Sequence, residues 1–353
     1  MATLTQTAYW TRKGMLVGTI VLIGFIVLKV SLTLAGNVWR KIHPPPPPPP
    51  TMAFGKLPKL AFPEQNPPAG ETKLIFKLET IQGGLPKLST IGKVYFMPKE
   101  GPNLLALDRA RQKAQKMGFR SQSEKVSETV YRWTDQKTPP TTLEMDINTG
   151  NFYLRYPYED DQALLTSKNL PPNQQAASEA RNFLASNGLL TDDLATGSAE
   201  FDYLRFTPPT LVSAISLSEA DFVRVNLFRA SLDSLKILPP NPKESLISFL
   251  FSGSRELGKR IIEINYNYFP VEKETFATYP LKPINTAWQE LQGGQGYIAN
   301  LGQNEQGQIT IRQVYLGYYD AKDPQNFLQP IYVFEGDKNF FGYVSAIDPK
   351  WTE

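Results

Sequence analysis

The chain of 353 residues contains no cysteine and a single histidine, His43. The lack of cysteine excludes disulfide bonds, thiolate metal sites and cysteine nucleophiles. His43 stands directly before a run of prolines, where no pocket can form around it, so histidine catalysis and histidine metal sites are excluded as well. We therefore expect no metal site and no histidine- or cysteine-based active site.

Acidic residues are absent from residues 1–50, which hold five basic residues: Arg12, Lys13, Lys29, Arg40 and Lys41. The formal net charge of +3 is thus concentrated at the N-terminus, and the rest of the chain is close to neutral. The basic residues flank an apolar stretch instead of alternating with aromatic residues. We expect no binding to nucleic acid.

The apolar stretch, residues 14–39, is long enough as a helix to cross a hydrocarbon core of about 30 Å. Trp10 and Trp39 bracket it, and tryptophan concentrates at the two membrane–water interfaces. A buried core helix and a cleaved signal peptide are the alternatives, but the run is long for a signal peptide. We expect a single uncleaved transmembrane helix after a short N-terminal tail, residues 1–13.

Lys29 lies well inside the expected span. A charge at the bilayer centre costs about 2–3 kcal/mol on insertion scales, so Lys29 either extends toward an interface or pairs with an acidic residue of a neighbouring span. Basic residues on the two sides of the span balance, so charge does not set its orientation. A short tail, one span and a large C-terminal body resemble signal-anchored bacterial envelope proteins, and we expect an extracytoplasmic body.

Residues 44–50 are all proline. Such a run adopts polyproline II, at about 3.1 Å per residue or roughly 22 Å in total. With further prolines up to Pro68, residues 40–70 are predicted to form a stalk that holds the body away from the membrane. A docking peptide for a proline-binding domain is the alternative.

The body repeats a pattern of one helix followed by antiparallel strands. Two helices of equal length are framed by Asn103 and Gly118 and by Asn173 and Gly188, because asparagine is a preferred N-cap and glycine accepts the conformation that ends a helix. A third, shorter helix starts in the stretch Pro283–Thr286 and stops at Gly293. The expected buried stripes are Leu104, Leu107, Ala114 and Met117, then Ala176, Ala180, Phe183 and Leu184, then Ala287, Trp288 and Leu291.

Alternating apolar and polar residues predict the strands 141–147, 151–158, 309–319, 329–336 and 340–347. A further strand, 261–269, places Ile262, Ile264, Tyr266 and Tyr268 on one face. The fold class is thus α+β, with three units at residues 71–160, 161–280 and 281–353, each sheet packing on its own helix. The middle unit carries an insertion between Pro208 and Arg260.

The segment LEMDINTGNFYL is similar to the strand–turn–strand hairpin of PepSY domains, with Asp146, Thr149 and Gly150 at the matching positions. The stretch from Ala287 to Ile347 resembles the final repeat of the YycH/YycI family. This resemblance implies PepSY-like units in a single-span bacterial protein that regulates a membrane sensor kinase. The insertion and the proline stalk depart from that family.

Motifs for catalysis or cofactors are missing. The chain has no S-x-x-K, G-x-S-x-G or P-loop sequence, and the dinucleotide-like residues 294–299 follow a helix instead of a strand. The Asp146 loop opens like a calcium site but has Pro157 where the bidentate glutamate belongs. Two acidic clusters, Glu159–Asp161 and Asp192–Asp193, lie in turns, where charged residues are usually solvated.

We therefore expect a membrane-anchored extracytoplasmic module that binds or regulates a protein partner, with no cofactor and no catalytic residue. An envelope scaffold that binds cell-wall or surface components is one alternative, and a carboxylate-based hydrolase is another. The sequence does not predict the partner, the ligand or the oligomeric state.

Overall fold

The computed structural model describes residues 4–42, 48–64, 74–99, 101, 103–256, 258–304 and 307–353. It divides into two compact units, Met1–Pro49 and Pro50–Glu353, the second of which we call the body. Several residues used above lie outside the described residues: His43, residues 44–47 of the proline run and residues 65–70 of the expected stalk.

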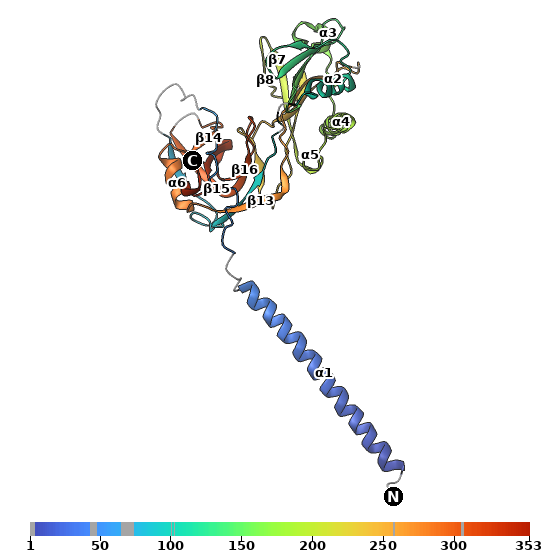
Figure 1. Cartoon of the computed structure of the whole chain (residues 1–353), viewed down its shortest axis with the longest axis vertical. Coiled ribbons are helices and arrows are strands. Elements are labelled where there is room, and N and C mark those ends of the chain that lie inside the picture. Colours follow the sequence, from blue (N-terminus) through green and yellow to red (C-terminus); the bar gives the residue numbers. More distant parts are fainter. Residues whose placement is uncertain are drawn as a thin grey trace. The chain divides into compact units, whose positions relative to one another are not determined.

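The N-terminal unit contains one long helix, α1 (Leu4–Ile42) (Figure 1). The most apolar window of 18 residues within its segment Ala8–Trp39 has a mean hydropathy of 2.4, and none of that window is buried. The hydroxyl of Thr33 donates to the carbonyl oxygen of Lys29 (3.0 Å), so this polar group is paired within the helix. The helix is long and apolar enough to cross a membrane, and it begins ten residues before the predicted boundary.

The larger sheet of the body has nine strands, and every neighbouring pair is antiparallel. Its strands, in spatial order, are β3 (Glu124–Lys125), β4 (Val130–Thr134), β5 (Thr142–Asp146), β6 (Phe152–Arg155), β12 (Ile261–Tyr266), β11 (Ile247–Ser252), β9 (Phe222–Leu227), β7 (Ala199–Thr207) and β8 (Thr210–Ser213).

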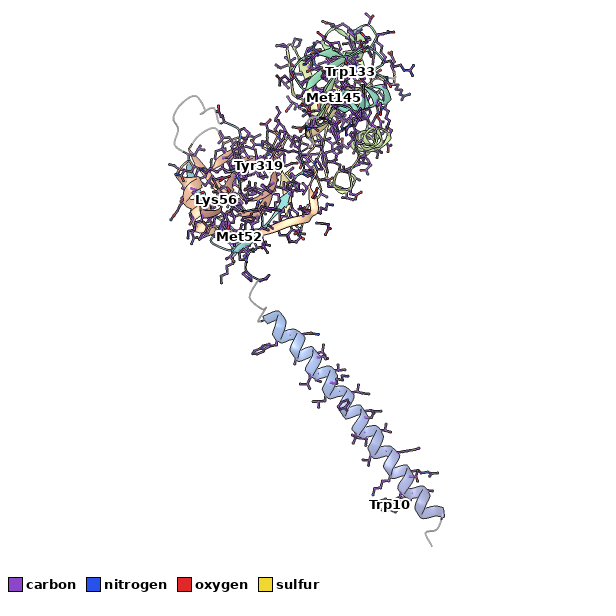
Figure 2. All side chains as sticks on the ribbon, viewed as in Figure 1. Trp10, Met52, Lys56, Trp133, Met145 and Tyr319 are labelled. Atoms are coloured by element: carbon purple, nitrogen blue, oxygen red, sulfur yellow. The ribbon has the colours of Figure 1, made fainter. Side chains whose placement is uncertain are left out.

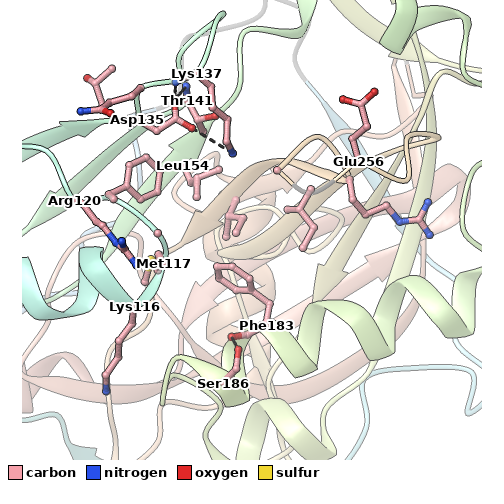
Figure 3. Close-up of a pocket in the computed structure, with 18 of the residues that line it drawn as sticks. Lys116, Met117, Arg120, Asp135, Lys137, Thr141, Leu154, Phe183, Ser186 and Glu256 are labelled. Atoms are coloured by element: carbon pink, nitrogen blue, oxygen red, sulfur yellow. Dashed lines mark hydrogen bonds and ion pairs between the residues drawn. The ribbon is translucent and has the colours of Figure 1, made fainter.

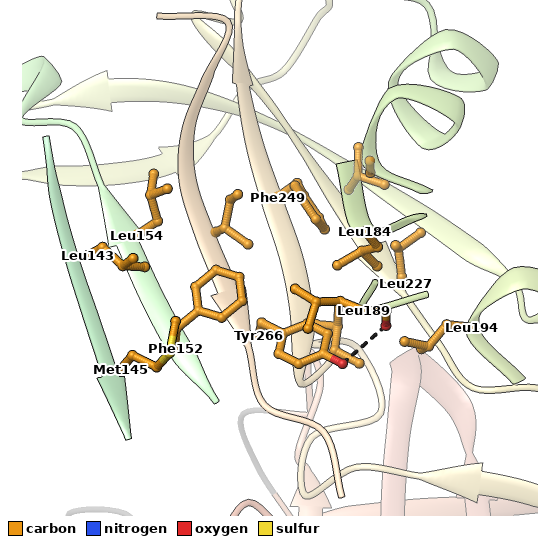
Figure 4. Close-up of a cluster of buried hydrophobic side chains, with 14 of the residues drawn as sticks. Leu143, Met145, Phe152, Leu154, Leu184, Leu189, Leu194, Leu227, Phe249 and Tyr266 are labelled. Carbon is orange, nitrogen blue, oxygen red and sulfur yellow. Dashed lines mark hydrogen bonds between the residues drawn. The ribbon is translucent and has the colours of Figure 1, made fainter. Parts of the chain in front are cut away.

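Two helices, α2 (Ala106–Lys116) and α4 (Asn173–Ser186), pack on one face of the nine-stranded sheet, where α2 contacts β5 and α4 contacts β9. Figure 4 shows part of the apolar core between these layers, with Leu143, Phe152, Leu184 and Phe249 among its residues. The short elements η1 (Tyr158–Asp160), α3 (Gln162–Thr166) and α5 (Asp192–Thr196) complete this half of the body.

The apolar side chains of β12 do not all lie on one face of the sheet, as was expected. Ile264 and Tyr266 join the core beneath α4, but Ile262 belongs to a separate cluster with Tyr156 and Leu164. The register of β11 and β12 shifts at this point, so Ile262 is the extra residue of a bulge and turns to the opposite face. The prediction that Ile262 and Ile264 share one face is therefore wrong.

The helix ends follow the prediction better than the helix starts. Gly118 and Gly188 have φ of +97° and +70°, so both end their helices in the left-handed conformation. Asn103 is not an N-cap, because its Oδ1 accepts from the amide of Leu105 (2.9 Å) and α2 begins only at Ala106. Asn173 is already helical, with Pro172 in the N-cap position.

The apolar stripe of α2 also differs from the prediction. Leu104 precedes the helix and is fully exposed, whereas Ala106, Ala110 and Ala114 are buried. Their spacing of four residues places the three alanines on one face, and their small side chains let α2 lie close to the sheet. The stripe of α4 is confirmed by the buried residues Ala176, Ala180 and Leu184.

The second sheet has eight strands and is mixed, because β1 and β10 pair with β15 in parallel. Its central order is β1 (Ile75–Leu78), β15 (Gln308–Tyr319), β16 (Phe327–Gly336), β17 (Phe340–Ser345) and β14 (Tyr297–Asn300), and its other strands are β10 (Lys236–Leu238), β2 (Ile91–Phe96) and β13 (Glu272–Pro280). The predicted three-strand meander is confirmed as β15–β16–β17.

The helix α6 (Ile284–Gln292) packs against β17, with Ala287 and Leu291 buried. Its N-cap is Pro283, which agrees with the predicted start in the stretch Pro283–Thr286. The residue with positive φ at its end is Gly294 (φ +77°), one position after the predicted Gly293. The short elements η2 (Asp337–Asn339) and η3 (Pro349–Trp351) complete the chain.

The two sheets divide the body differently from the three expected units. β6 pairs with β12, with Leu154 opposite Ile264, so strands of the first two expected units share one sheet. β1 and β2 belong instead to the eight-stranded sheet with the last strands of the chain. Strand pairing depends on contacts between distant segments, which local patterns do not encode.

The expected stalk is shorter than predicted, because residues 51–62 pack on the body. Leu57 is fully buried, and its amide donates to the carbonyl oxygen of Trp351 (2.8 Å). The ring of Phe62 stacks on that of Tyr297, with centroids 5.1 Å apart. Prolines prevent regular structure here, but the apolar residues between them still find partners. Figure 2 labels Met52 from this segment.

Candidate functional site

A cavity of about 1320 Å³ opens in the nine-stranded half of the body (Figure 3). One wall comes from the end of α2 and the residues after it, and the other from α4. In Figure 3, Lys116, Met117 and Arg120 lie on the first wall and Phe183 and Ser186 on the second. The cavity exceeds the roughly 300–1,000 Å³ of ordinary small-molecule pockets.

The strand order explains the cavity. α2 contacts β5 and α4 contacts β9, and three strands, β6, β12 and β11, lie between them. Four strand spacings amount to about 19 Å, whereas two packed helices lie about 8–10 Å apart. The two helices therefore do not pack directly against each other, and the cavity opens between them above a floor of buried side chains.

The cavity has an apolar floor and a charged rim. Leu154 and Ile264 are buried side chains of β6 and β12, and Phe183 of α4 packs edge-on against Phe249 (5.8 Å between centroids). The charged residues around this floor are Lys116, Arg120, Asp135, Lys137, Glu179, Arg255, Glu256 and Arg260. Five of these eight side chains are basic, so the rim has an excess of positive charge.

Most of the acidic groups at the rim already have basic partners. Glu179 accepts from Arg260 (3.1 Å between Oε2 and Nε), and these hydrogen bonds hold the pKa of Glu179 below its usual range. Asp135 lies 3.5 Å from Lys137, and Glu256 lies 3.7 Å from Lys259.

Three cations at the rim remain without an acidic partner. Among the residues that the structure describes, Lys116, Arg120 and Arg255 form no ion pair with Asp or Glu. Arg255 faces the side-chain oxygen of Asn169 when that amide is correctly oriented (3.1 Å), which is a neutral contact. The rim therefore offers positive charge to an anionic ligand.

Thr141 adds an unsatisfied polar group to the wall of the cavity. Its side chain is 5% exposed, and its Oγ1 has no hydrogen-bond partner among the described residues. Its amide is satisfied by Oδ1 of Asp135 (2.8 Å), so only the hydroxyl is left. A buried hydroxyl without a partner costs free energy, and this oxygen is too deeply buried for a ligand in the cavity to reach.

The residues singled out in the sequence lie elsewhere. Lys29, Trp10 and Trp39 belong to α1, in the other compact unit. Asp146, Thr149 and Gly150 form the turn between β5 and β6. There Oδ1 of Asp146 accepts from the amide of Thr149 (2.8 Å), and Gly150 has φ +73°, so the predicted hairpin is confirmed.

The two acidic clusters were predicted to be solvated. The structure instead gives one carboxylate of each cluster a structural role. Asp161 caps α3, accepting from the amide of Leu164 (3.0 Å) and from Lys259 (2.8 Å). Asp193 accepts from Nε of Arg229 (2.6 Å), and the side chains of Asp193 and Arg229 are only 11% and 5% exposed. Each carboxylate thus has a structural partner from a distant segment. Among the described residues, no group of three potential metal ligands comes together.

Sequence reasoning missed the cavity itself. Its residues come from five separate segments of the chain, and no motif joins Phe183 to Leu154 or to Arg120. The only local indication was the pair of long helices, which predicted two covering elements but not the number of strands between them.

No protein-family model matches the chain. No curated protein matches it either. Among solved structures, it is similar to an uncharacterized protein from Eubacterium rectale ATCC 33656, with 12% sequence identity and a TM-score of 0.42. The alignment covers 79% of this chain and 90% of that one. This similarity is too weak to carry an argument about fold or function.

Proposed function

We propose that the protein is a membrane-anchored binding module whose body acts outside the cytoplasm on a protein partner, through the cavity between α2 and α4. The cavity carries this proposal, because it combines an apolar floor with three cations that have no acidic partner among the described residues. Protein interfaces commonly have this anatomy of an apolar centre and a polar rim. α1 supports the membrane anchor.

The resemblance to PepSY and YycH/YycI proteins fits such a role, with a membrane sensor kinase as one candidate partner. The Asp146–Gly150 hairpin agrees with a structural role for that motif. The cavity is a separate feature, formed by α2, α4 and the strands between them.

The topology is tested by reporter fusions after Glu353, one active only outside the cytoplasm and one only inside. We expect the external reporter alone to be active. An active cytoplasmic reporter would overturn the proposed location of the body.

The binding site is tested by a crosslinked pull-down with the full-length protein in mild detergent. Ser186→Trp should fill the cavity, because Ser186 lines it and its side chain is exposed. Gln174→Trp is the matched control, since Gln174 is exposed on the same helix and about 130° of rotation away from the cavity side. We expect a specific partner that is lost with Ser186→Trp and kept with Gln174→Trp. Equal recovery with both variants would contradict the proposal.

A further inference from the structure

We infer that the cavity between α2 and α4 receives one amphipathic helix of the protein partner, with its apolar face on the sheet and acidic residues toward the rim. This inference rests on the proposed function, because it specifies the partner element that the same site binds. Helix-in-groove recognition is a common mode of peptide binding.

The separation of α2 and α4 across the sheet carries the first step. The separation of about 19 Å between the strands under α2 and α4 is close to twice the distance of about 8–10 Å between packed helices. One more helix therefore fits between α2 and α4, in contact with both. A single extended strand is narrower and would leave part of the floor uncovered.

The floor provides the apolar contact that a helix needs. Leu154 and Ile264 lie in direct register on adjacent strands and are themselves buried. The lining apolar side chains that keep exposed surface are Ile261 at the floor and Phe183, which projects from the wall of α4 (Figure 3). Met117 faces the cavity from the opposite wall, and methionine adapts to differently shaped partners. Apolar residues spaced three and four apart on a helix would lie along this floor.

The positive charge of the rim favours a bound helix with acidic residues on its polar face. Lys116 and Arg120 lie on the α2 wall and Arg255 on the far side, and none has an acidic partner among the described residues. The negative end of the α2 dipole attracts Lys116, but Arg120 lies beyond the helix. Glutamate or aspartate beside the apolar stripe of the bound helix would pair with these cations.

The test measures binding of fluorescent peptides to the full-length protein in detergent. The first probe is a helical peptide of about 16 residues with leucines at i, i+3, i+4 and i+7 and glutamates on the flanks of that stripe. The second has lysine in place of glutamate, and the third has the composition of the first in a scrambled order. We expect the glutamate peptide to bind at least about tenfold more tightly than the other two.

Charge reversal at the rim provides the decisive comparison. In the double variant Lys116→Glu/Arg120→Glu, the preference should switch to the lysine peptide. Lys243→Glu/Lys322→Glu is the control, because both lysines are exposed and neither lines the cavity. All four positions are exposed, and circular dichroism verifies that each variant is folded. A control that switches equally would show a general charge effect and overturn the inference.

If the cavity binds a ligand other than an amphipathic helix, the binding experiments should give different results. Equal binding of the amphipathic and scrambled peptides, or no binding of either, overturns the helix as the ligand. Oleate that binds at the cavity while no peptide does would identify an anionic amphiphile instead. If a partner is lost with Ser186→Trp but no helical peptide binds, the proposed function stands and this inference fails.

Discussion

Arg229 and Asp320 form a buried ion pair that joins the two sheets of the body. Nη1 of Arg229 lies 3.3 Å from Oδ2 of Asp320, and the side chains are 5% and 9% exposed. Arg229 follows β9 of the nine-stranded sheet, and Asp320 follows β15 of the eight-stranded sheet. Asp193 and the ring of Tyr268 also contact the guanidinium, which lies 4.7 Å from the ring centroid.

Asp320→Ala should therefore destabilise the body strongly. Burial raises the pKa of Asp320, and the charge of Arg229 opposes that shift, so each group depends on the other. Loss of one member of a buried pair costs about 3–5 kcal/mol. Chemical unfolding measures this loss. Arg312→Ala is the control, because its pair with Asp337 is exposed to solvent and should contribute much less to stability. Equal losses of unfolding free energy in the two variants would show that the buried Arg229–Asp320 pair matters no more than an exposed pair.

Asp161 should make stability depend on pH in the acid range. Hydrogen bonds from Lys259 and Tyr156 lower the pKa of Asp161 from 3.8 to about 2. A carboxyl with a lowered pKa in the folded state stabilises the fold above pH 3.8, and this contribution is lost as the pH falls toward 2. The contribution is about 2 kcal/mol at neutral pH.

Unfolding of the wild type and Asp161→Asn across this range tests the effect of Asp161. The variant should be less stable at pH 7, and its stability should fall less between pH 4 and pH 2. Asp160→Asn changes the exposed neighbouring residue and should leave the slope unchanged. A slope for Asp161→Asn equal to that of the wild type would show that Asp161 does not titrate as described.

The turn at Asp146 should be sensitive to its side chain. Asp146→Ala removes the acceptor for the amides of Asn148 and Thr149 and for the hydroxyl of Thr129. We expect a loss of about 1–3 kcal/mol in the free energy of unfolding. Gly150→Ala should also destabilise the hairpin, whereas Gly150→Asn should be milder, because asparagine tolerates positive φ better. Equal effects of alanine and asparagine would argue against backbone strain as the cause.

The segment after the prolines should contribute to the stability of the body. Leu57→Ala opens a cavity at a fully buried position and should cost about 2–5 kcal/mol. The exposed neighbour provides the control Lys56→Ala, with little expected change. Thermal unfolding of both variants decides whether residues 51–62 belong to the body. Unchanged stability in Leu57→Ala would show that residues 51–62 do not stabilise the body and would support the original prediction of a stalk.

Substitution of Lys29 tests whether this residue is only a tolerated charge or contacts a partner within the membrane. If Lys29 pairs with an acidic residue of a neighbouring span, Lys29→Leu should weaken the complex by about 1–3 kcal/mol and Lys29→Arg should preserve it. Co-purification at matched expression measures both variants. Unchanged recovery with leucine would assign partner binding to the body alone.

Features that depend on nearby residues could be predicted from the sequence. The hairpin at Asp146, the apolar stripe of α4 and the β15–β16–β17 meander all rest on local spacing. The pairing of β6 with β12, the burial of Leu57 and the partners of Asp193 depend on segments far apart in the chain. The cavity belongs to this second group, because its width is set by the strands that fold between α2 and α4.

The pairing of early and late strands has a consequence for biosynthesis. β1 and β2 leave the ribosome first, but they pair with β15 and with β13, near the other end of the chain. At about 5–20 residues per second, translation leaves these early strands without partners for roughly 10–40 s. All strands of the nine-stranded sheet lie within residues 124–266, so that half can fold first. The early strands then require protection from aggregation until translation reaches their partners.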